Sequence, residues 1–325
     1  GTIAEARTAS EKPAASAAYS PDGRWILCSG ADGALMLLGD DAVPRDAWSG
    51  AEGGTLVAFL DGGRAIQAAG PAAAAVWQVA PRYSLARTIG GELTPPATED
   101  DPGLPPIDVV TALAFSPDGA ILASGSGRPS RSGEIKLWNV ADGALVREFQ
   151  APHSDTVTAL EFSRKGDLLA SGGTDRFVKV HTVAEGKHVK SFEGHTGHVL
   201  GVAWQANGRR LSSAGADNAI KVWDVVTGEQ QRTIGGAKKE VTAVRFIAPG
   251  EEVVACSGDP TVRLYNAGNG STVREFAGAA DFVQAVAVGP TSLAAACQDG
   301  KLRLWTVADG KLVHTLEPSP APAKQ

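Results

Sequence analysis

The stretch Ile135-Lys-Leu-Trp-Asn-Val140 recurs along this chain with small changes. It returns as Val178-Lys-Val-His-Thr-Val183, Ile220-Lys-Val-Trp-Asp-Val225, Val262-Arg-Leu-Tyr-Asn-Ala267 and Leu302-Arg-Leu-Trp-Thr-Val307. The fourth position of each copy falls at Trp138, His181, Trp223, Tyr265 and Trp305, about 42 residues apart. A period of ~40–45 residues indicates a repeat architecture in which each unit packs on its neighbours.

The clearest full unit runs from His198 to Ile234 and contains four short apolar or alternating runs. They are separated by Asn-Gly, Ala-Asp-Asn and Thr-Gly-Glu, which are turn compositions, so we predict four antiparallel strands per unit. Firm copies of the unit lie at 109–150, 156–194, 198–235, 240–278 and 282–317, and degenerate copies lie at 14–50 and 54–90.

The recurring Ser-Pro-Asp-Gly, Leu-Ala-Ser-Gly and Lys-Leu-Trp-Asn motifs, with Gly194-His195, resemble those of the WD40 repeat family. The resemblance implies an all-β fold, a seven-bladed WD40 β-propeller in which each blade is a four-stranded antiparallel sheet. Residues 14–317 would form this single domain, followed by a disordered tail at 318–325. The family closes its ring with an N-terminal strand, but the last repeat here owns four strands, which leaves residues 1–13 as a segment that can pair at the seam.

Two insertions interrupt the repeats. Residues 91–108 join the second and third units and are rich in proline and acidic residues, so we predict a structureless loop. Residues 125–134 lengthen the connection between the second and third strands of the third unit. WD40 topology would place both on the same face, and long loops in a compact array are more often functional or disordered than neutral.

Composition excludes several classes of function. The net charge of −6 argues against nucleic acid, whose binding depends on Lys and Arg. The sequence contains no run of ~18 apolar residues, so it predicts no membrane span. The cysteines Cys28, Cys256 and Cys297 lie in strand segments of different repeats and are interpreted as small buried hydrophobic residues. The N-terminus lacks the pattern of a secretion signal, so localisation stays open.

One set of side chains invites a catalytic interpretation. His195, Ser213, Asp217 and Trp223 occupy the positions of the WD40 His-Ser-Asp-Trp tetrad, and the first three also suit a hydrolytic triad. We favour a structural tetrad, because a nucleophile would need exposure and oxyanion donors. His195 and His198 alone are too few ligands for a zinc ion, so we expect no metal site. We also expect no enzymatic activity and no cofactor. A partial tetrad consists of His153, Ser171, Asp175 and His181.

The resemblance also implies a partner-binding surface. In WD40 proteins the residues before strand one and before the turn aspartate face the channel mouth and often contact partners. An exposed Phe282 would be an anchor for a partner, unless it tucks under the neighbouring loop. A basic patch is the second expectation, unless its members pair with the acidic loop at 92–101. The positions at the mouth are Thr156, Thr174, His198, Ala216, Lys238, Glu240, Gly258, Phe282 and Gln298, and the patch consists of Lys238, Lys239, Arg128 and Arg131.

We therefore predict a monomeric, non-enzymatic scaffold that binds a protein or peptide at the channel-mouth face. The alternatives are an enzyme with a small-molecule site at the mouth and a structural spacer. The stretch from Ile135 to Ile234 is also similar to WD40 regions of bacterial multidomain proteins that carry a c-type cytochrome domain. That likeness implies an exported, periplasmic parent chain and a docking role. No Cys-x-x-Cys-His is present, so this chain would hold no covalent haem.

Overall fold

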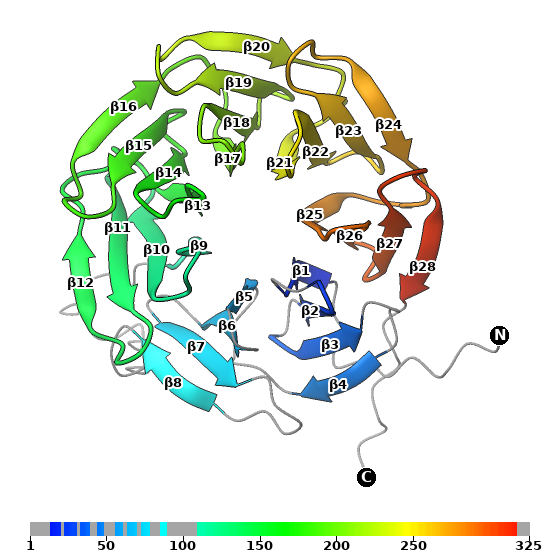
Figure 1. The fold of residues 1–325 in the computed structure, drawn as a ribbon, viewed down its shortest axis with the longest axis horizontal. Helices are drawn as coiled ribbons and strands as arrows, with labels where there is room; N and C mark the ends of the chain where they lie inside the picture. The colour runs from blue at the N-terminus through cyan, green and yellow to red at the C-terminus, as the bar shows by residue number, and fades with distance from the viewer. Residues whose placement is uncertain are drawn as a thin grey trace, which may run out of the picture.

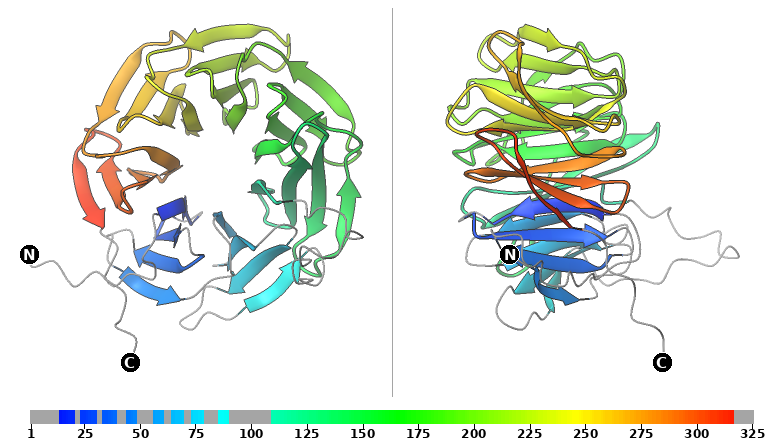
Figure 2. Two further views of the ribbon diagram at one scale, coloured as in Figure 1. Left: turned by 180° about the vertical axis from the view of Figure 1, so that it is seen from behind. Right: turned by 90° about the vertical axis from the view of Figure 1, so that its right-hand side faces the viewer.

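The chain forms a ring of β-sheets in the computed structural model (Figure 1). The structure describes residues 14–20, 23–30, 33–39, 44–48, 56–60, 64–69, 73–78, 85–89 and 109–316. Within these ranges, consecutive strands form seven four-stranded antiparallel sheets. The first strand of each sheet lies at the central channel and the fourth at the rim. Seen from the side, the ring is a disc (Figure 2).

We number the sheets in chain order, and their strands are as follows. Sheet 1 contains β1 (Ala14–Tyr19), β2 (Trp25–Gly30), β3 (Leu35–Gly39) and β4 (Pro44–Trp48). Sheet 2 contains β5 (Val57–Leu60), β6 (Arg64–Ala69), β7 (Ala73–Gln78) and β8 (Leu85–Ile89). Sheet 3 contains β9 (Ala112–Phe115), β10 (Ile121–Arg128), β11 (Ser132–Asn139) and β12 (Leu145–Glu148). Sheet 4 contains β13 (Val157–Phe162), β14 (Leu168–Gly173), β15 (Val178–Thr182) and β16 (His188–Phe192).

The remaining sheets repeat the same order. Sheet 5 contains β17 (Val199–Trp204), β18 (Arg210–Gly215), β19 (Ile220–Asp224) and β20 (Gln230–Ile234). Sheet 6 contains β21 (Val241–Ile247), β22 (Glu252–Ser257), β23 (Val262–Asn266) and β24 (Thr272–Phe276). Sheet 7 contains β25 (Val283–Val288), β26 (Ser292–Cys297), β27 (Leu302–Thr306) and β28 (Leu312–Leu316).

The prediction of a seven-bladed propeller needs a correction. Six blades, sheets 1 and 3 to 7, have strands whose side chains are largely described. Sheet 2 is established by backbone pairing, and only residues 56–59 and Ile89 have described side chains there. Three of the six residues of its third strand, Ala73–Gln78, are alanines.

The apolar core lies between neighbouring sheets rather than in one central cluster. Between sheets 4 and 5, for example, Phe192 and Val180 pack with Trp223, all less than 2% exposed. The three cysteines are buried and free, as expected of small apolar side chains. Each interface thus depends on two adjacent repeats, which is the physical basis of stability in repeat proteins.

A basic side chain on the rim strand connects several neighbouring sheets. Arg274 on β24 donates a hydrogen bond to the carbonyl of Val307 in sheet 7 at 2.7 Å. Three other residues at the same place in their strands donate to the next sheet in the same way. They are Arg147 to Ala184 at 2.7 Å, Lys190 to Val226 at 3.0 Å and Arg232 to Gly268 at 2.9 Å.

The ring closes where sheet 1 packs on sheet 7. The hydroxyl groups of Tyr19 and Ser292 are 2.7 Å apart, and Ile26 and Leu38 pack with Leu304 in one apolar cluster. All four strands of sheet 7 come from consecutive residues, so this sheet takes no strand from the N-terminal repeat. The expected pairing of residues 1–13 at the seam, the loop at 91–108 and the tail at 318–325 lie outside the described residues.

The insertion at 125–134 is a hairpin rather than an irregular loop. It continues β10 and β11, whose pairing extends from Ile121↔Asn139 to Arg128↔Ser132. The hairpin rests on sheet 4, where Gly133 N donates to His153 O at 3.0 Å and Ser130 N donates to Asp155 Oδ1 at 2.9 Å. Small residues in 125–134 let the backbone of the hairpin approach sheet 4 closely. Turn composition alone does not indicate this packing.

Candidate functional site

The residues expected at the channel mouth are brought together in pairs. Thr174 N donates to Thr156 O at 2.9 Å, and Ala216 N donates to His198 O at 2.8 Å. Gly258 N donates to Glu240 O at 2.9 Å, and Gln298 N to Phe282 O at 2.8 Å. Each pair joins the residue before an inner strand to the residue before a turn aspartate. Because all inner strands run in the same direction through the ring, these pairs share one end of the channel, which we call the channel-mouth face.

Exposure separates the members of this face into two groups. The first group is buried or partly buried and helps to hold the loops. Its buried members are Thr156 and Gly258, and its partly buried members are Glu240, Thr174 and Phe282. The remaining side chains at the mouth are free to contact a partner. They are His198, Ala216, Lys238, Lys239 and Gln298, all exposed.

Phe282 lies against the neighbouring loop instead of standing free. A Cβ atom added to Gly258 would be 2.8 Å from Cε2 of Phe282 and 2.9 Å from Cβ of Lys239. The aromatic ring and the lysine side chain therefore both lie over Gly258, across the junction of sheets 6 and 7. Phe282 is thus a half-buried edge of the face rather than an isolated anchor.

The four expected basic residues form two pairs rather than one patch. Arg128 and Arg131 lie on the hairpin of β10 and β11, which leans on sheet 4. Lys238 and Lys239 precede β21 on the other side of the channel (Figure 1). The acidic segment 92–101, the alternative partner for these charges, lies outside the described residues.

The tetrad side chains of sheet 5 are hydrogen-bonded to one another. His195 Nδ1 lies 2.9 Å from Asp217 Oδ1, and its Nε2 lies 2.7 Å from Ser213 Oγ. Trp223 Nε1 donates to the same Ser213 oxygen at 2.8 Å. Burial lowers the pKa of His195, and the bond to Asp217 opposes that shift. Ser213 has 0% exposure and two partners, so its hydroxyl has no access to a substrate.

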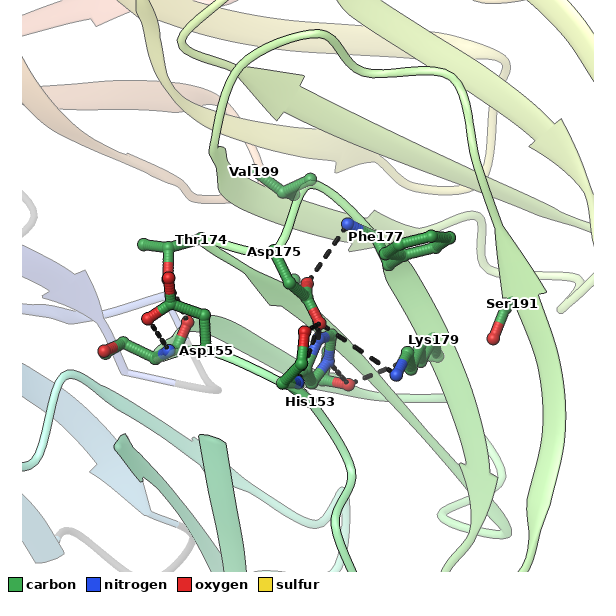
Figure 3. Close-up of polar contacts among 12 residues, drawn as sticks. His153, Asp155, Thr174, Asp175, Phe177, Lys179, Ser191 and Val199 are labelled. Carbon is green, nitrogen blue, oxygen red and sulfur yellow. Dashed lines mark hydrogen bonds and ion pairs between the residues drawn. The ribbon is translucent and has the colours of Figure 1, made fainter. Parts of the chain in front are cut away.

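Sheet 4 keeps the same arrangement with one change, and Figure 3 shows the contact between its His153 and Asp175. His153 Nδ1 lies 2.9 Å from Asp175 Oδ1, and His153 Nε2 lies 2.8 Å from Ser171 Oγ. Asp175 also accepts from Phe177 N at 3.2 Å, and Lys179 lies 4.0 Å away. His181 replaces the tryptophan, and its buried Nδ1 has no hydrogen-bond partner among the described residues. Burial, with further lowering by the charge on His188, brings the pKa of His181 to about 4.

In sheets 6 and 7 an arginine replaces the tetrad histidine as the partner of the turn aspartate. Arg263 Nη1 lies 3.1 Å from Asp259 Oδ2, and Arg303 Nη2 lies 2.5 Å from Asp299 Oδ2. Sequence reasoning missed these ion pairs. The signal was present, since the residue four positions after the turn aspartate is lysine in the histidine-containing sheets and arginine in these two.

The described residues contain neither a candidate metal site nor a membrane-spanning helix. No group of three or more His, Cys, Asp or Glu side chains is placed there to hold a metal ion. No helix in the same part of the chain is long and apolar enough to cross a bilayer.

Comparison with known proteins identifies the repeat. The family model of the WD domain, G-beta repeat, matches residues 8–37, 107–139, 143–182, 186–224 and 228–266, more than half of the chain. The chain belongs to the WD40 family. The matched residues include part of the degenerate first WD40 repeat, at 8–37. A search of curated proteins gave no significant match.

Many solved structures share this WD40 architecture, with 1868 chains matching significantly. One is the computationally designed Ika8 protein, which is 25% identical with a TM-score of 0.71. The alignment covers 95% of this chain and 88% of the designed one. So common a fold does not specify a function, which must be argued from the site. The narrower likeness to cytochrome-carrying proteins stays a prediction.

Proposed function

We propose that this WD40 propeller is a non-catalytic scaffold that binds a protein or peptide partner on its channel-mouth face. A scaffold role is consistent with the family. The observation that carries the proposal is the backbone hydrogen bond within each loop pair, from Thr156–Thr174 to Phe282–Gln298. Loops held in this way lose little conformational freedom when a partner binds, which lowers the cost of association.

The exposed side chains of the channel-mouth face take no part in packing the core. At the position before the inner strand, His198 is replaced by threonine, glutamate or phenylalanine in other repeats, and at the position before the turn aspartate, Gln298 is replaced by threonine, alanine or glycine. Repeated positions hold the fold together, whereas these positions vary between repeats. Variation on a rigid frame supports recognition of an extended, irregular surface such as a peptide segment.

The polar sets that resemble a hydrolytic triad support the non-catalytic proposal. Ser171 and Ser213 are both 0% exposed, and each hydroxyl lies within hydrogen-bond distance of a histidine. A serine nucleophile needs access to a carbonyl carbon and donors for the developing oxyanion. Neither serine has that access, so the tetrads are assigned to stability.

Site-specific photocrosslinking in the native host tests this proposal. A photoreactive residue would replace Lys238 or Gln298 on the channel-mouth face, and Lys165 in the turn between β13 and β14 at the other end of the ring would be the matched control. We expect one partner to be crosslinked from both positions on the face and not from Lys165. Equal crosslinking from Lys165, or none from the face, would overturn the proposal.

A further inference from the structure

The central channel is lined almost entirely by uncharged side chains. It has a volume of about 400 Å³, within the size range of small-ligand sites. Its walls come from the inner strands and carry mainly alanine, valine and leucine, with threonines such as Thr158 and Thr242. Among the described residues that line it, Arg245 is the one charged side chain.

Arg245 stands at a level of the channel where other sheets have alanine. The equivalent position is Ala114 in sheet 3, Ala203 in sheet 5 and Ala287 in sheet 7. The exception is Glu161 on β13, two sheets away from Arg245. Of the alanines at this level, Ala18, Ala58 and Ala287 line the channel and form an apolar part of its wall, whereas Ala203 is buried in the core.

The charge of Arg245 is not neutralised by a close ion pair. Its Nη1 donates to Val244 O at 2.8 Å, and it forms no ion pair within 4.0 Å among the described residues. Glu161 interacts with it over a longer distance, but its own Oε2 accepts from Trp204 N at 2.6 Å. Burial raises the pKa of Glu161 to about 7, so near neutral pH this carboxyl group carries only part of a negative charge.

The threonine hydroxyls of the channel are already engaged in holding the ring together. Thr242 donates to Val283 O of the next sheet at 2.8 Å, and Thr158 donates to Val199 O. They therefore offer little to a ligand with many oxygens. A phosphate group has more oxygen acceptors and more charge than a carboxylate, so a single bidentate arginine fork leaves more of it unpaired.

We propose that the channel binds a monocarboxylate with a short apolar body. Its carboxylate pairs with the guanidinium of Arg245, and its body lies against the alanine wall formed by residues such as Ala287 and Ala18. The site is distinct from the channel-mouth face. Arg245 lies four residues beyond Val241, which begins β21, and four residues of a strand span about 13 Å.

Isothermal titration of the whole chain with hexanoate tests this site. We expect saturable binding of one hexanoate per chain, a loss of at least tenfold in affinity in Arg245→Met, and a smaller loss in Arg245→Lys, which keeps the charge but not the fork. Arg209→Met, on an exposed turn, is the matched control and should bind as the wild type does. Glu161→Gln should bind more tightly at pH 8, because a neutral amide removes a like charge.

Acetate and inorganic phosphate separate the chemical classes. Acetate should bind more weakly than hexanoate, because it lacks the apolar body, and phosphate should not bind measurably. Hexanoate binding that survives in Arg245→Met, no saturable binding by the wild type, or phosphate binding as tight as hexanoate would each overturn the assignment. A Lys238→Glu, Lys239→Glu variant should keep hexanoate binding, so the outcome is independent of the partner proposed for the mouth.

Discussion

Gly215 and His195 are a sterically matched pair. A Cβ atom on Gly215 would lie 2.4 Å from His195 Nδ1 and 2.4 Å from Asp217 Oδ1. The same relationship recurs one sheet earlier, where a Cβ on Gly173 would lie 2.6 Å from His153 Nδ1. In sheets 6 and 7, Ala237 and Ala279 replace the histidine, and the glycine position then holds a larger residue. These residues are Ser257 and Cys297.

Gly215→Ala should therefore destabilise the fold. The added methyl group cannot avoid both the imidazole and the carboxylate, so the tetrad must shift, at a cost of about 2–4 kcal/mol. Urea unfolding followed by tryptophan fluorescence measures the midpoint. Ser257→Ala is the matched control, because that position already carries a Cβ, and it should cost less than about 1 kcal/mol. Equal effects of the two substitutions would refute the steric pairing.

His181→Phe should reduce the sensitivity of the protein to acid. The pKa of His181 in the folded state, about 4, is below the ordinary value of 6.5. As pH falls below about 6.5 the unfolded chain therefore binds the proton first, and this part of the stability is lost down to about pH 4. Between pH 7 and pH 5 the wild type should lose about 2 kcal/mol more than the variant. Parallel stability profiles for the two proteins would show that His181 does not titrate in this way.

Arg274→Met should weaken the contact between sheets 6 and 7. Methionine keeps much of the aliphatic length but cannot donate to Val307 O, so we expect a loss of about 1–2 kcal/mol. Thermal unfolding measures the loss. Arg209→Met, on an exposed turn, should change stability by less than about 0.5 kcal/mol. If both substitutions had the same small effect, the rim hydrogen bonds would contribute nothing measurable.

Glu161→Gln should remove a loss of stability that the wild type undergoes as the pH rises. The folded pKa of about 7 exceeds the ordinary 4.5, so the folded state binds the proton more tightly and wild-type stability declines as pH rises between these values. The amide can still accept from Trp204 N. Relative to the wild type, the variant should gain about 1–3 kcal/mol between pH 5 and pH 8. The exposed Glu229→Gln is the control, and a gain independent of pH would contradict the assignment.

Much of the architecture was predictable from the sequence. The motif ending in Val140 recurs with a period, and turns such as Asn207-Gly208 separate short apolar runs, so four strands per unit could be predicted, and sheets 3 to 7 each have four strands. These features are local, and short-range backbone preferences determine them. The alanine-rich second repeat gave a weaker signal, because periodicity is read from the contrast between apolar and polar residues, and its runs of alanine offer little contrast.

The details of the site depend on contacts between repeats, which no local pattern reports. The sequence left open whether Phe282 anchors a partner or tucks under the neighbouring loop, and in the structure its ring packs over Gly258 from the neighbouring sheet. Arg245 and Glu161 drew no attention in the sequence, because their positions become unusual only when seven inner strands are superimposed around one channel. The pairing of Arg263 with Asp259 likewise emerges only from the geometry.

The most direct test of the central claim is the affinity for the partner that crosslinking identifies. It would be measured with purified chain for the wild type, for Lys238→Glu with Lys239→Glu, and for Arg164→Glu with Lys165→Glu at the opposite end of the ring. We predict at least a tenfold loss of affinity for the charge reversal on the channel-mouth face, equivalent to about 1.4 kcal/mol, and an unchanged affinity for the other. Equal affinities for all three proteins, or a loss only in the Arg164 and Lys165 variant, would contradict the account.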